Sequence, residues 1–331
     1  MTDPRFDVLA VGNAIVDVIT DSSDAFLADQ SLDKGSMRLI DEVEAVRLYA
    51  AMGAGREVSG GSAGNTAAGL AAMGIRTGFI GQVADDELGD IYRHDIGAQG
   101  VEFLVEPRGG LGATARCLIL VTPDAQRTMN TFLGAAQRLS VGAVDMGAVR
   151  DAAILYLEGY LWDPAEPRAA MEAAIEAAHG AGRKVAFTLS DSFCIARHRA
   201  DFLRLIEHGK VDILFANAAE IAELAGTDNV EQAVAAFKDK VTTLVVTRSE
   251  RGALAVSGSE RADVPAAPIE RLVDTTGAGD LFAAGFLAGE VRGIGLEGSL
   301  RLGAIAAAEV IQHYGARPER DLAALAGKLL A

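Results

Sequence analysis

The sequence predicts an α/β fold built on a central, mostly parallel sheet that helices cover. Of the 331 residues, 50% are hydrophobic and 23% are charged, which is typical of a globular chain long enough for one large domain. From Ala152 onward, short apolar runs alternate with stretches of helical periodicity. This alternation is typical of parallel strands joined by helical crossovers.

The individual elements follow from the apolar runs. Phe6–Gly12 is a short apolar run closed by glycine, as expected of a buried strand. Further strands are expected at residues 153–157, 184–189, 212–216 and 243–247. Helices are expected at residues 66–73, 166–179, 200–207, 218–225, 230–238, 280–290 and 297–313.

Two segments, at about residues 14–42 and 101–131, break this pattern. The first is polar and contains a Lys34-Gly35-Ser36 turn, and the second contains a glycine-rich turn followed by the strand-like run Thr114–Val121. We expect both to form antiparallel strands outside the main sheet; the simplest alternative is two ordinary surface hairpins. No long repeat or linker divides the chain, so residues 1–331 are expected to form a single domain.

Charge and cysteine content exclude several classes of partner. The net charge of −16 and the pI of about 4.7 repel nucleic acid and anionic membranes. Cys117 and Cys194 show no C-x-x-C spacing, which favours free thiols in a reducing compartment. The N-terminus lacks the order of a signal peptide, and no apolar run is long enough to cross a bilayer. We therefore expect a cytoplasmic protein.

The run Asp274-Thr-Thr-Gly-Ala-Gly-Asp280 is the strongest functional signal in the chain. Three small residues, Gly277, Ala278 and Gly279, precede a carboxylate and a helix-patterned apolar stretch. The first N–H groups of a helix lack internal partners and, with the helix dipole, favour an anion such as a transferring phosphoryl group. Asp280 would lie beside that anion, where it could accept a proton from a hydroxyl. The alternative is that Asp280 only caps a helix.

This run, together with Gly60-Gly61-Ser62-Ala63-Gly64-Asn65, resembles the signatures of the ribokinase-like (PfkB) family of sugar and nucleoside kinases. The resemblance implies a three-layer α/β/α domain, with the two irregular segments forming a small β-sheet lid over the sugar site. It implies Asp280 as the catalytic base and Gly277, Ala278 and Gly279 as the anion hole. ATP would be the co-substrate and Mg²⁺ the cofactor.

The same resemblance assigns the acceptor side of the site. Asn13 and Asp17 follow the first strand, at the sheet edge where ligands of α/β proteins bind. Asp17, Gly60, Gly61 and Asn65 match positions that contact sugar hydroxyls in the family. From the residues alone, Asp17 could equally be a solvated loop carboxylate, and the glycines could serve close helix–sheet packing.

The nucleotide side is distributed over later segments. Asn217-Ala-Ala-Glu220 matches an element that organises Mg²⁺ through its water shell, although alone it would indicate only a helix cap. Thr247-Arg-Ser-Glu-Arg-Gly252 resembles the family's nucleotide loop, with Ser249 in place of the usual glycine. The expected nucleotide contacts are Asn217, Thr247, Arg248, Gly252, Thr275, Gly277 and Gly279; the expected metal contacts are Glu220 for Mg²⁺ and Asp274 and Thr276 for a possible K⁺.

Within the family, three features indicate the adenosine kinase branch. One is the Gly-Asn-x-x-x-Asp start at Asn13 and Asp17; another is Arg127, which lies in a stretch where that branch places an arginine near the transferred phosphate. The third is Tyr160 and Trp162, either of which could stack on a purine or belong to the core. Arg127 could equally be a solvated surface residue.

The sequence thus predicts an ATP-dependent phosphotransferase acting on a sugar hydroxymethyl group, with the 5′-hydroxyl of adenosine as the best-supported acceptor. Its partners would be a small nucleoside or sugar and ATP, and the protein would be a monomer or a homodimer. A kinase for free ribose or fructose is the alternative within the class, and a non-catalytic nucleoside or nucleotide sensor is the alternative outside it. A dinucleotide oxidoreductase is disfavoured because Gly293-Ile-Gly-Leu-Glu-Gly298 does not follow a strand.

Overall fold

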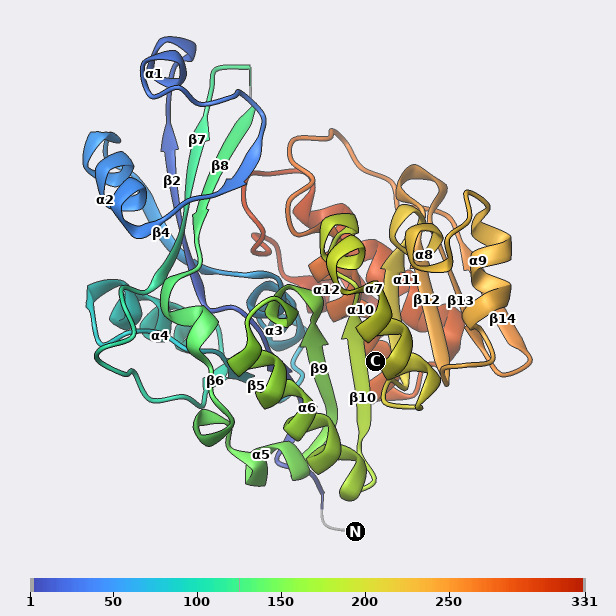
Figure 1. The fold of residues 1–331 in the computed structure, drawn as a ribbon. Coiled ribbons are helices and arrows are strands. Elements are labelled where there is room, and N and C mark those ends of the chain that lie inside the picture. The colour runs from blue at the N-terminus through green and yellow to red at the C-terminus, as the bar shows by residue number, and fades with distance from the viewer. Residues whose placement is uncertain (1–2, 125, 330–331) are drawn as a thin grey trace.

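The computed structural model describes residues 3–124 and 126–329, and within them the main sheet has nine strands (Figure 1). Neighbouring strands run parallel from β6 to β12, and β13 and β14 add an antiparallel edge. The predicted α/β class is therefore confirmed. In spatial order the strands are β14 (Glu260–Val264), β13 (Ala253–Ser257), β12 (Thr243–Thr247), β11 (Ile213–Asn217), β10 (Lys184–Thr188), β9 (Ala152–Glu158), β1 (Phe6–Val11), β5 (Thr77–Ile80) and β6 (Glu102–Phe103).

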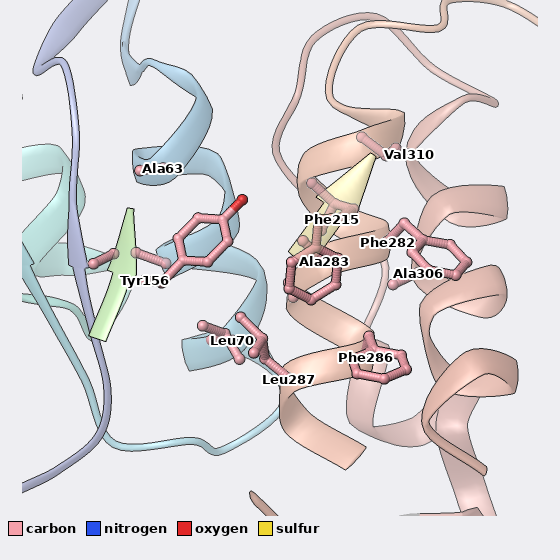
Figure 2. Close-up of a cluster of buried hydrophobic side chains, with 14 of the residues drawn as sticks. Ala63, Leu70, Tyr156, Phe215, Phe282, Ala283, Phe286, Leu287, Ala306 and Val310 are labelled. Atoms are coloured by element: carbon pink, nitrogen blue, oxygen red, sulfur yellow. The ribbon is translucent and has the colours of Figure 1, made fainter. Parts of the chain in front are cut away.

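Two hydrophobic cores lie on opposite faces of the main sheet. Side chains alternate along each strand, so Tyr156 of β9 belongs to one core and Leu155 and Leu157 belong to the other. In Figure 2, Tyr156 and Phe215 lie between the strands and the helices of the first core. Helices of this core include α3 (Ser62–Ala72), α10 (Ala278–Arg292), α11 (Gly295–Val310) and α12 (Leu322–Ala326); those of the other are α5 (Met146–Arg150), α6 (Ala165–Gly180), α7 (Ser192–Glu207), α8 (Ala218–Ala225) and α9 (Val230–Phe237).

A second sheet of five strands stands apart from the main sheet (Figure 1). Its β2–β4 and β7–β8 pairs are antiparallel, but its β2–β7 and β3–β8 pairs are parallel. The expectation of purely antiparallel strands is therefore wrong, because the chain leaves this sheet and returns between these pairs. The strands, in order, are β3 (Met37–Leu39), β8 (Arg127–Phe132), β7 (Ala115–Val121), β2 (Ile15–Asp21) and β4 (Arg56–Gly60).

Some elements differ from the sequence-based expectation. β4 lies outside the two irregular segments, and β6 lies inside the second of them but pairs with the main sheet. The hairpin β13–β14 was not expected at all. Strand β5 and five further helices were also unexpected, namely α1 (Asp24–Asp29), α2 (Glu42–Ala51), α4 (Glu87–Ala98) and the short α5 and α12. Within the described residues, no helix has the length and apolar character needed to cross a membrane.

Candidate active site

A cavity of 660 Å³ lies between the small sheet and the carboxyl ends of the main-sheet strands. This is the edge at which open α/β sheets bind ligands. The cavity brings together segments more than 250 residues apart, from Asn13 after β1 to Asp280 in α10. The sequence-predicted residues that line it are Asn13, Asp17, Gly61, Asn65, Tyr160, Asn217, Glu220, Thr247, Thr275, Thr276, Gly277, Gly279 and Asp280.

Asp280 occupies the first turn of α10, and both of its carboxylate oxygens accept hydrogen bonds. Ser62 Oγ donates to Oδ1 at 2.6 Å, and Asn65 Nδ2 donates to Oδ2 at 2.8 Å. Burial raises the pKa of the Asp280 carboxyl, while these two bonds and the charge of Arg317 act in the opposite direction. Ser62 was not singled out from the sequence, although it lies inside the glycine-rich motif. The arrangement fixes a carboxylate at the floor of the cavity.

The turn before Asp280 requires glycine at one position. Gly277 has φ +77°, and a Cβ built there would lie 2.6 Å from Cβ of Ala316. Among the described residues, no side chain caps the first turn of α10. Its leading N–H groups lack intrahelical partners, and Gly277 and Gly279 line the cavity. This end of the cavity is therefore suited to an anion.

Arg127 lies beside this turn but does not line the cavity itself. Its Nη1 lies 2.6 Å from Asp274 Oδ2, and it also donates to the hydroxyl of Thr276. Asp274 accepts two further bonds, from the N–H of Thr276 and of Gly315, each at 3.0 Å. A guanidinium therefore occupies the place predicted for K⁺, so Asp274 and Thr276 do not fit a K⁺ site in this arrangement.

Glu158, at the end of β9, organises the segments expected to bind the acceptor, a role that the sequence did not indicate. Its carboxylate accepts from the N–H and the Nδ2 of Asn13 and from the N–H of Ala63, each at 2.7 Å. Burial raises the pKa of Glu158 to about 7, against the lowering effect of these bonds. Gly61 packs in the same region, with φ +84° and a built Cβ only 2.1 Å from the carbonyl oxygen of Asn13. Glu158 thus joins two acceptor segments.

Asp17 projects from β2 of the small sheet. A Cβ on Gly60 would lie 2.4 Å from an Asp17 carboxylate oxygen, so the predicted Gly60 serves this carboxylate by leaving room for it. Burial, with a smaller contribution from Asp280, raises the pKa of Asp17 to about 6. Strand register places Cys117 and Thr131 in one row with Asp17, and all three line the cavity.

Asn217 and Glu220 form a capping box at the start of α8. Asn217 Oδ1 accepts from the N–H of Glu220 at 2.8 Å, and Glu220 Oε2 accepts from the N–H of Asn217 at 2.9 Å. Burial raises the pKa of Glu220 to about 7. No group of three His, Cys, Asp or Glu side chains in the described chain could hold a metal ion. The pair therefore fits Mg²⁺ only through water or nucleotide oxygens.

The loop after β12 contributes fewer residues to the cavity than the sequence predicts. Thr247 lines the cavity, but Arg248 Nη1 lies 3.0 Å from Asp263 and its Nη2 donates to a backbone carbonyl. Gly252 packs under β14, with a built Cβ 2.0 Å from the carbonyl oxygen of Val264. The prediction that Arg248 and Gly252 contact nucleotide is therefore not supported by their positions. Ser249 adopts φ +53°, the region that a glycine enters without strain.

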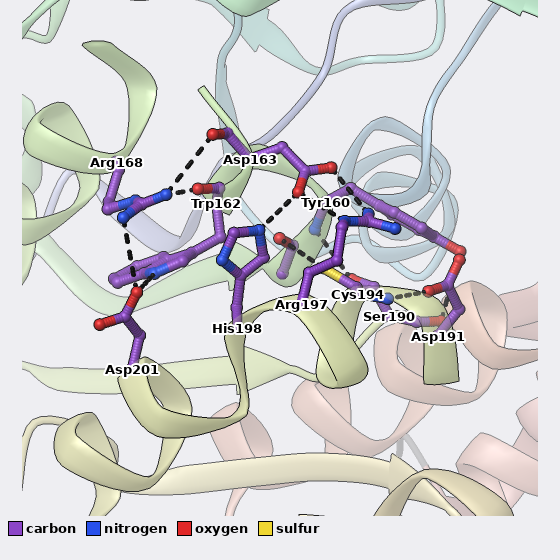
Figure 3. Close-up of polar contacts among 11 residues, drawn as sticks. Tyr160, Trp162, Asp163, Arg168, Ser190, Asp191, Cys194, Arg197, His198 and Asp201 are labelled. Atoms are coloured by element: carbon purple, nitrogen blue, oxygen red, sulfur yellow. Dashed lines mark hydrogen bonds and ion pairs between the residues drawn. The ribbon is translucent and has the colours of Figure 1, made fainter. Parts of the chain in front are cut away.

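Tyr160 and Trp162, both drawn in Figure 3, differ in environment, because the first lines the cavity and the second is buried. Tyr160 lines the cavity, and its hydroxyl donates to the carbonyl of Ser190 at 3.3 Å. Trp162 is fully buried in the core, where its Nε1 donates to Asp201 at 3.2 Å. Stacking of a base on Trp162 is therefore ruled out in this arrangement, since the ring faces away from the cavity. The exposed Phe193 lines the cavity instead.

Comparison with known proteins agrees with this geometry. The chain is 47% identical to an adenosine kinase from Sinorhizobium meliloti of known structure, with a TM-score of 0.90 and coverage of 98% of this chain and 99% of that one. It is 49% identical to a probable sugar kinase protein from Rhizobium etli CFN 42, with a TM-score of 0.91 and 98% coverage of each chain.

More distant relatives act on varied acceptors. An adenosine kinase of Saccharomyces cerevisiae is 28% identical over 95% of this chain and 96% of its own length. An ATP-dependent ribose-1-phosphate kinase of Halopiger xanaduensis is 31% identical over 70% of this chain and 73% of its own. The model of the pfkB family carbohydrate kinases matches residues 31–321. The chain therefore belongs to the PfkB family of kinases, phosphotransferases that act on a hydroxyl of a sugar or nucleoside.

Proposed function

We propose that this protein is an adenosine kinase, which transfers the γ-phosphoryl group of ATP to the 5′-hydroxyl of adenosine. The observation that carries the proposal is an apolar wall on the cavity face of the small sheet, opposite the polar floor that contains Asp280. The near full-length similarity to the Sinorhizobium meliloti adenosine kinase supports it. Similarity to a probable sugar kinase at comparable identity supports a free-sugar kinase as the second candidate.

The apolar wall consists of side chains from β3, β8 and the chain after β8. Met37 and Leu39 are 52% and 60% exposed, although both are large apolar residues that line the cavity. Met129 and Leu133 extend the same surface. A purine ring would cover this wall and gain about 25 cal/mol per Å² of apolar area removed from water. The C–H face of a free sugar is smaller and less flat than a purine ring, so the wall favours a nucleoside.

The polar groups suit the ribose and the reacting hydroxyl. Asp17 can accept from two neighbouring ribose hydroxyls, and Asn13, held by Glu158, can donate or accept. Asp280, fixed by Ser62 and Asn65, would accept the proton of the attacking hydroxyl as the oxygen–phosphorus bond forms. These groups would act on an acceptor that lies between the two sheets.

The phosphoryl end of the cavity would hold the transferred group. The N–H groups of the Gly277–Gly279 turn are suited to its oxygens. Nε and Nη2 of Arg127 are buried without a hydrogen-bond partner among the described residues, and Arg127 does not line the cavity, so this guanidinium would reach an anion only after a local rearrangement. Mg²⁺, when bound with ATP near Asn217 and Glu220, would neutralise phosphate charge.

We infer that the small sheet, formed by residues 14–42, β4, β7 and β8, acts as a lid that excludes water.

The acceptor is tested by measuring ADP release from ATP and Mg²⁺ with adenosine, inosine, ribose and fructose. We expect adenosine to give the highest kcat/KM. Release with ribose or fructose but not with adenosine would replace the proposal by the free-sugar kinase. If folded protein binds ATP but releases no ADP with any of these acceptors, both kinase candidates are overturned and a nucleoside or nucleotide sensor is favoured.

A substitution in the apolar wall sharpens this test. Leu39→Asn should raise the KM for adenosine about tenfold, because burial of one large apolar side chain is worth roughly 1.5–3 kcal/mol. Val43→Asn is the matched control, since Val43 is 79% exposed on α2 and does not line the cavity. An unchanged KM for adenosine in Leu39→Asn would show that the base does not lie on this wall.

A further inference from the structure

The three residues Gly315–Arg317, which follow α11, connect both ends of the cavity. The N–H of Gly315 donates to Asp274 Oδ2 at 3.0 Å, at the start of the phosphoryl-binding turn. Ala316 is buried and packs against Gly277 so closely that a Cβ there would have no room. Arg317 then reaches the acceptor side, where it contacts the segment between β4 and α3.

The Arg317 guanidinium binds both ends of the segment Ser59–Gly64, between β4 and α3. Its Nε and Nη2 donate to the carbonyl oxygen of Ser59 at 3.0 and 2.7 Å, and Nη2 also donates to Ser59 Oγ at 2.9 Å. Its Nη1 donates to the carbonyl oxygen of Gly64. Gly61, against which Asn13 packs, and Ser62, which donates to Asp280, lie between these two anchors.

Among the residues that the structure describes, the Arg317 guanidinium donates to neutral oxygens of Ser59 and Gly64 and to no carboxylate. Its charge is therefore not neutralised by direct contact, although several titratable groups face it. Asp17 faces it from β2, Asp280 from α10, and Tyr92 and Asp95 from α4. The Arg317 charge lowers the pKa of Asp17 and of Asp280, against the opposing effect of burial.

We propose that Arg317 is a positioning residue that clamps Ser59–Gly64 against the phosphoryl-binding turn. The clamp places Ser62 and Asn65 where they hold the base, so the two ends of the cavity keep one geometry. This inference rests on the roles proposed above for Asp17 and Asp280.

Two variants separate the clamp from the charge. Arg317→Lys keeps the positive charge but lacks the planar fork that reaches Ser59 and Gly64 together. Arg317→Gln loses both. We expect each to lower kcat/KM for adenosine about 10- to 100-fold. Only Arg317→Gln should move the acid limb of the pH profile of kcat/KM to higher pH, because Asp17 and Asp280 then lose a nearby cation.

Arg320→Gln is the matched control, because Arg320 is an exposed arginine three residues further along the same segment. It should leave kcat/KM and its pH profile unchanged. Backbone hydrogen exchange of residues 59–65 gives a readout that does not depend on turnover, and it should accelerate in both Arg317 variants but not in Arg320→Gln.

The outcomes are distinguishable from failure of the proposed function. If wild-type protein phosphorylates no acceptor, the proposed function fails, and the hydrogen-exchange measurement alone decides the clamp. If wild-type protein is active and both Arg317 variants match it in kcat/KM and exchange, the clamp is wrong. If the acid limb of the kcat/KM profile lies at the same pH in Arg317→Gln and Arg317→Lys, the Arg317 charge does not affect the ionisation of Asp17 and Asp280. Should Arg317→Gln not fold, Arg317→Lys still tests the clamp.

Discussion

The phosphoryl end and the acceptor end of the cavity are built in different ways. The phosphoryl end comes mainly from one contiguous run, Asp274–Asp280, at the start of α10. The acceptor end is assembled from the chain after β1, the small sheet, the β4–α3 segment and Glu158 at the end of β9. The difference teaches that the proposed transfer site comes from one local run of residues, whereas the proposed acceptor site depends on contacts between distant segments.

The two ends also differ in electrostatics. The phosphoryl end has the N-terminus of α10, whose dipole favours an anion, while the charge of Arg127 is paired with Asp274. The acceptor end contains Asp17 and Glu158, whose pKa values burial raises to about 6 and about 7. Hydroxyl groups donate to carboxylates, so this division matches a reaction between an anionic donor and a polyhydroxylated acceptor.

The largest effect is expected at Asp280, where the two ends meet. Asp280→Asn keeps the size of the side chain but removes the base, so turnover should fall on the order of 10²–10⁴-fold while ATP affinity changes little. Steady-state ADP release and ATP binding to the variant check this. A folded Asp280→Asn protein with near-normal turnover would overturn the assignment of the base.

Alanine substitutions at Gly61 and Gly277 should affect different ends of the cavity, and therefore the binding of different substrates. Gly61→Ala places a Cβ 2.1 Å from the carbonyl oxygen of Asn13, and Gly277→Ala places one 2.6 Å from Ala316, both at positive φ. Strain of this kind costs about 1–3 kcal/mol. We expect Gly61→Ala to raise the KM for the acceptor and Gly277→Ala to raise the KM for ATP, each about tenfold or more.

Gly109→Ala is the control for both, because a Cβ there meets nothing within 4 Å and its φ is not positive. Thermal unfolding of the three variants shows whether strain is relieved by local shifts or spreads through the fold. Equal effects of Gly61→Ala and Gly277→Ala on both substrates would mean that the two ends do not act separately.

A smaller effect is expected from pH, and it reports on the acceptor end. Asp17 is proposed to act as a carboxylate, and burial raises its pKa to about 6. Its contribution to kcat/KM should therefore be complete well above pH 6 and decrease as the pH falls through that value. At pH 5 about a tenth of Asp17 would remain ionised. A kcat/KM for adenosine that stays constant from pH 8 to pH 5 would contradict this role.

Much of the fold was predictable because its signals are local. The alternation from β9 to α9 follows apolar runs and helical periodicity, and the observed boundaries differ by a few residues at most positions, except that α7 begins at Ser192. β4 was missed because Arg-Glu-Val-Ser-Gly has no apolar pattern and its strand lies at the edge of the small sheet. The β13–β14 hairpin was missed because only its inner strand is apolar.

The site was predictable where a motif is contiguous and not where a contact is long-range. Gly277, Gly279 and Asp280 were proposed from one run of residues, and all three line the cavity. Glu158 and Arg317 act on segments 95 to 258 residues away in sequence, and no local pattern reveals such a partner. Arg248 was assigned to nucleotide by its motif, but its charge is taken up by Asp263, a residue on the unexpected hairpin.

The smallest effect on catalysis is expected at Trp162, which tests why two neighbouring aromatic residues differ. The 3-10 helix Gly159–Trp162 turns the Tyr160 side chain to the cavity and the indole of Trp162 into the core, beside Phe187 and Phe202. Trp162→Phe should leave the KM for adenosine within about twofold. It should lower the free energy of unfolding by about 1–3 kcal/mol, because Asp201 loses a donor and the core loses volume.

Tyr160→Ala is the counterpart to this variant, because it removes an aromatic ring from the cavity wall itself. It should raise the KM for adenosine about tenfold, since one base–aromatic contact is worth roughly 1–3 kcal/mol. A larger KM effect in Trp162→Phe than in Tyr160→Ala would restore the base contact that the buried position of Trp162 argues against. In that case the burial of Trp162 would not be what separates its role from that of Tyr160.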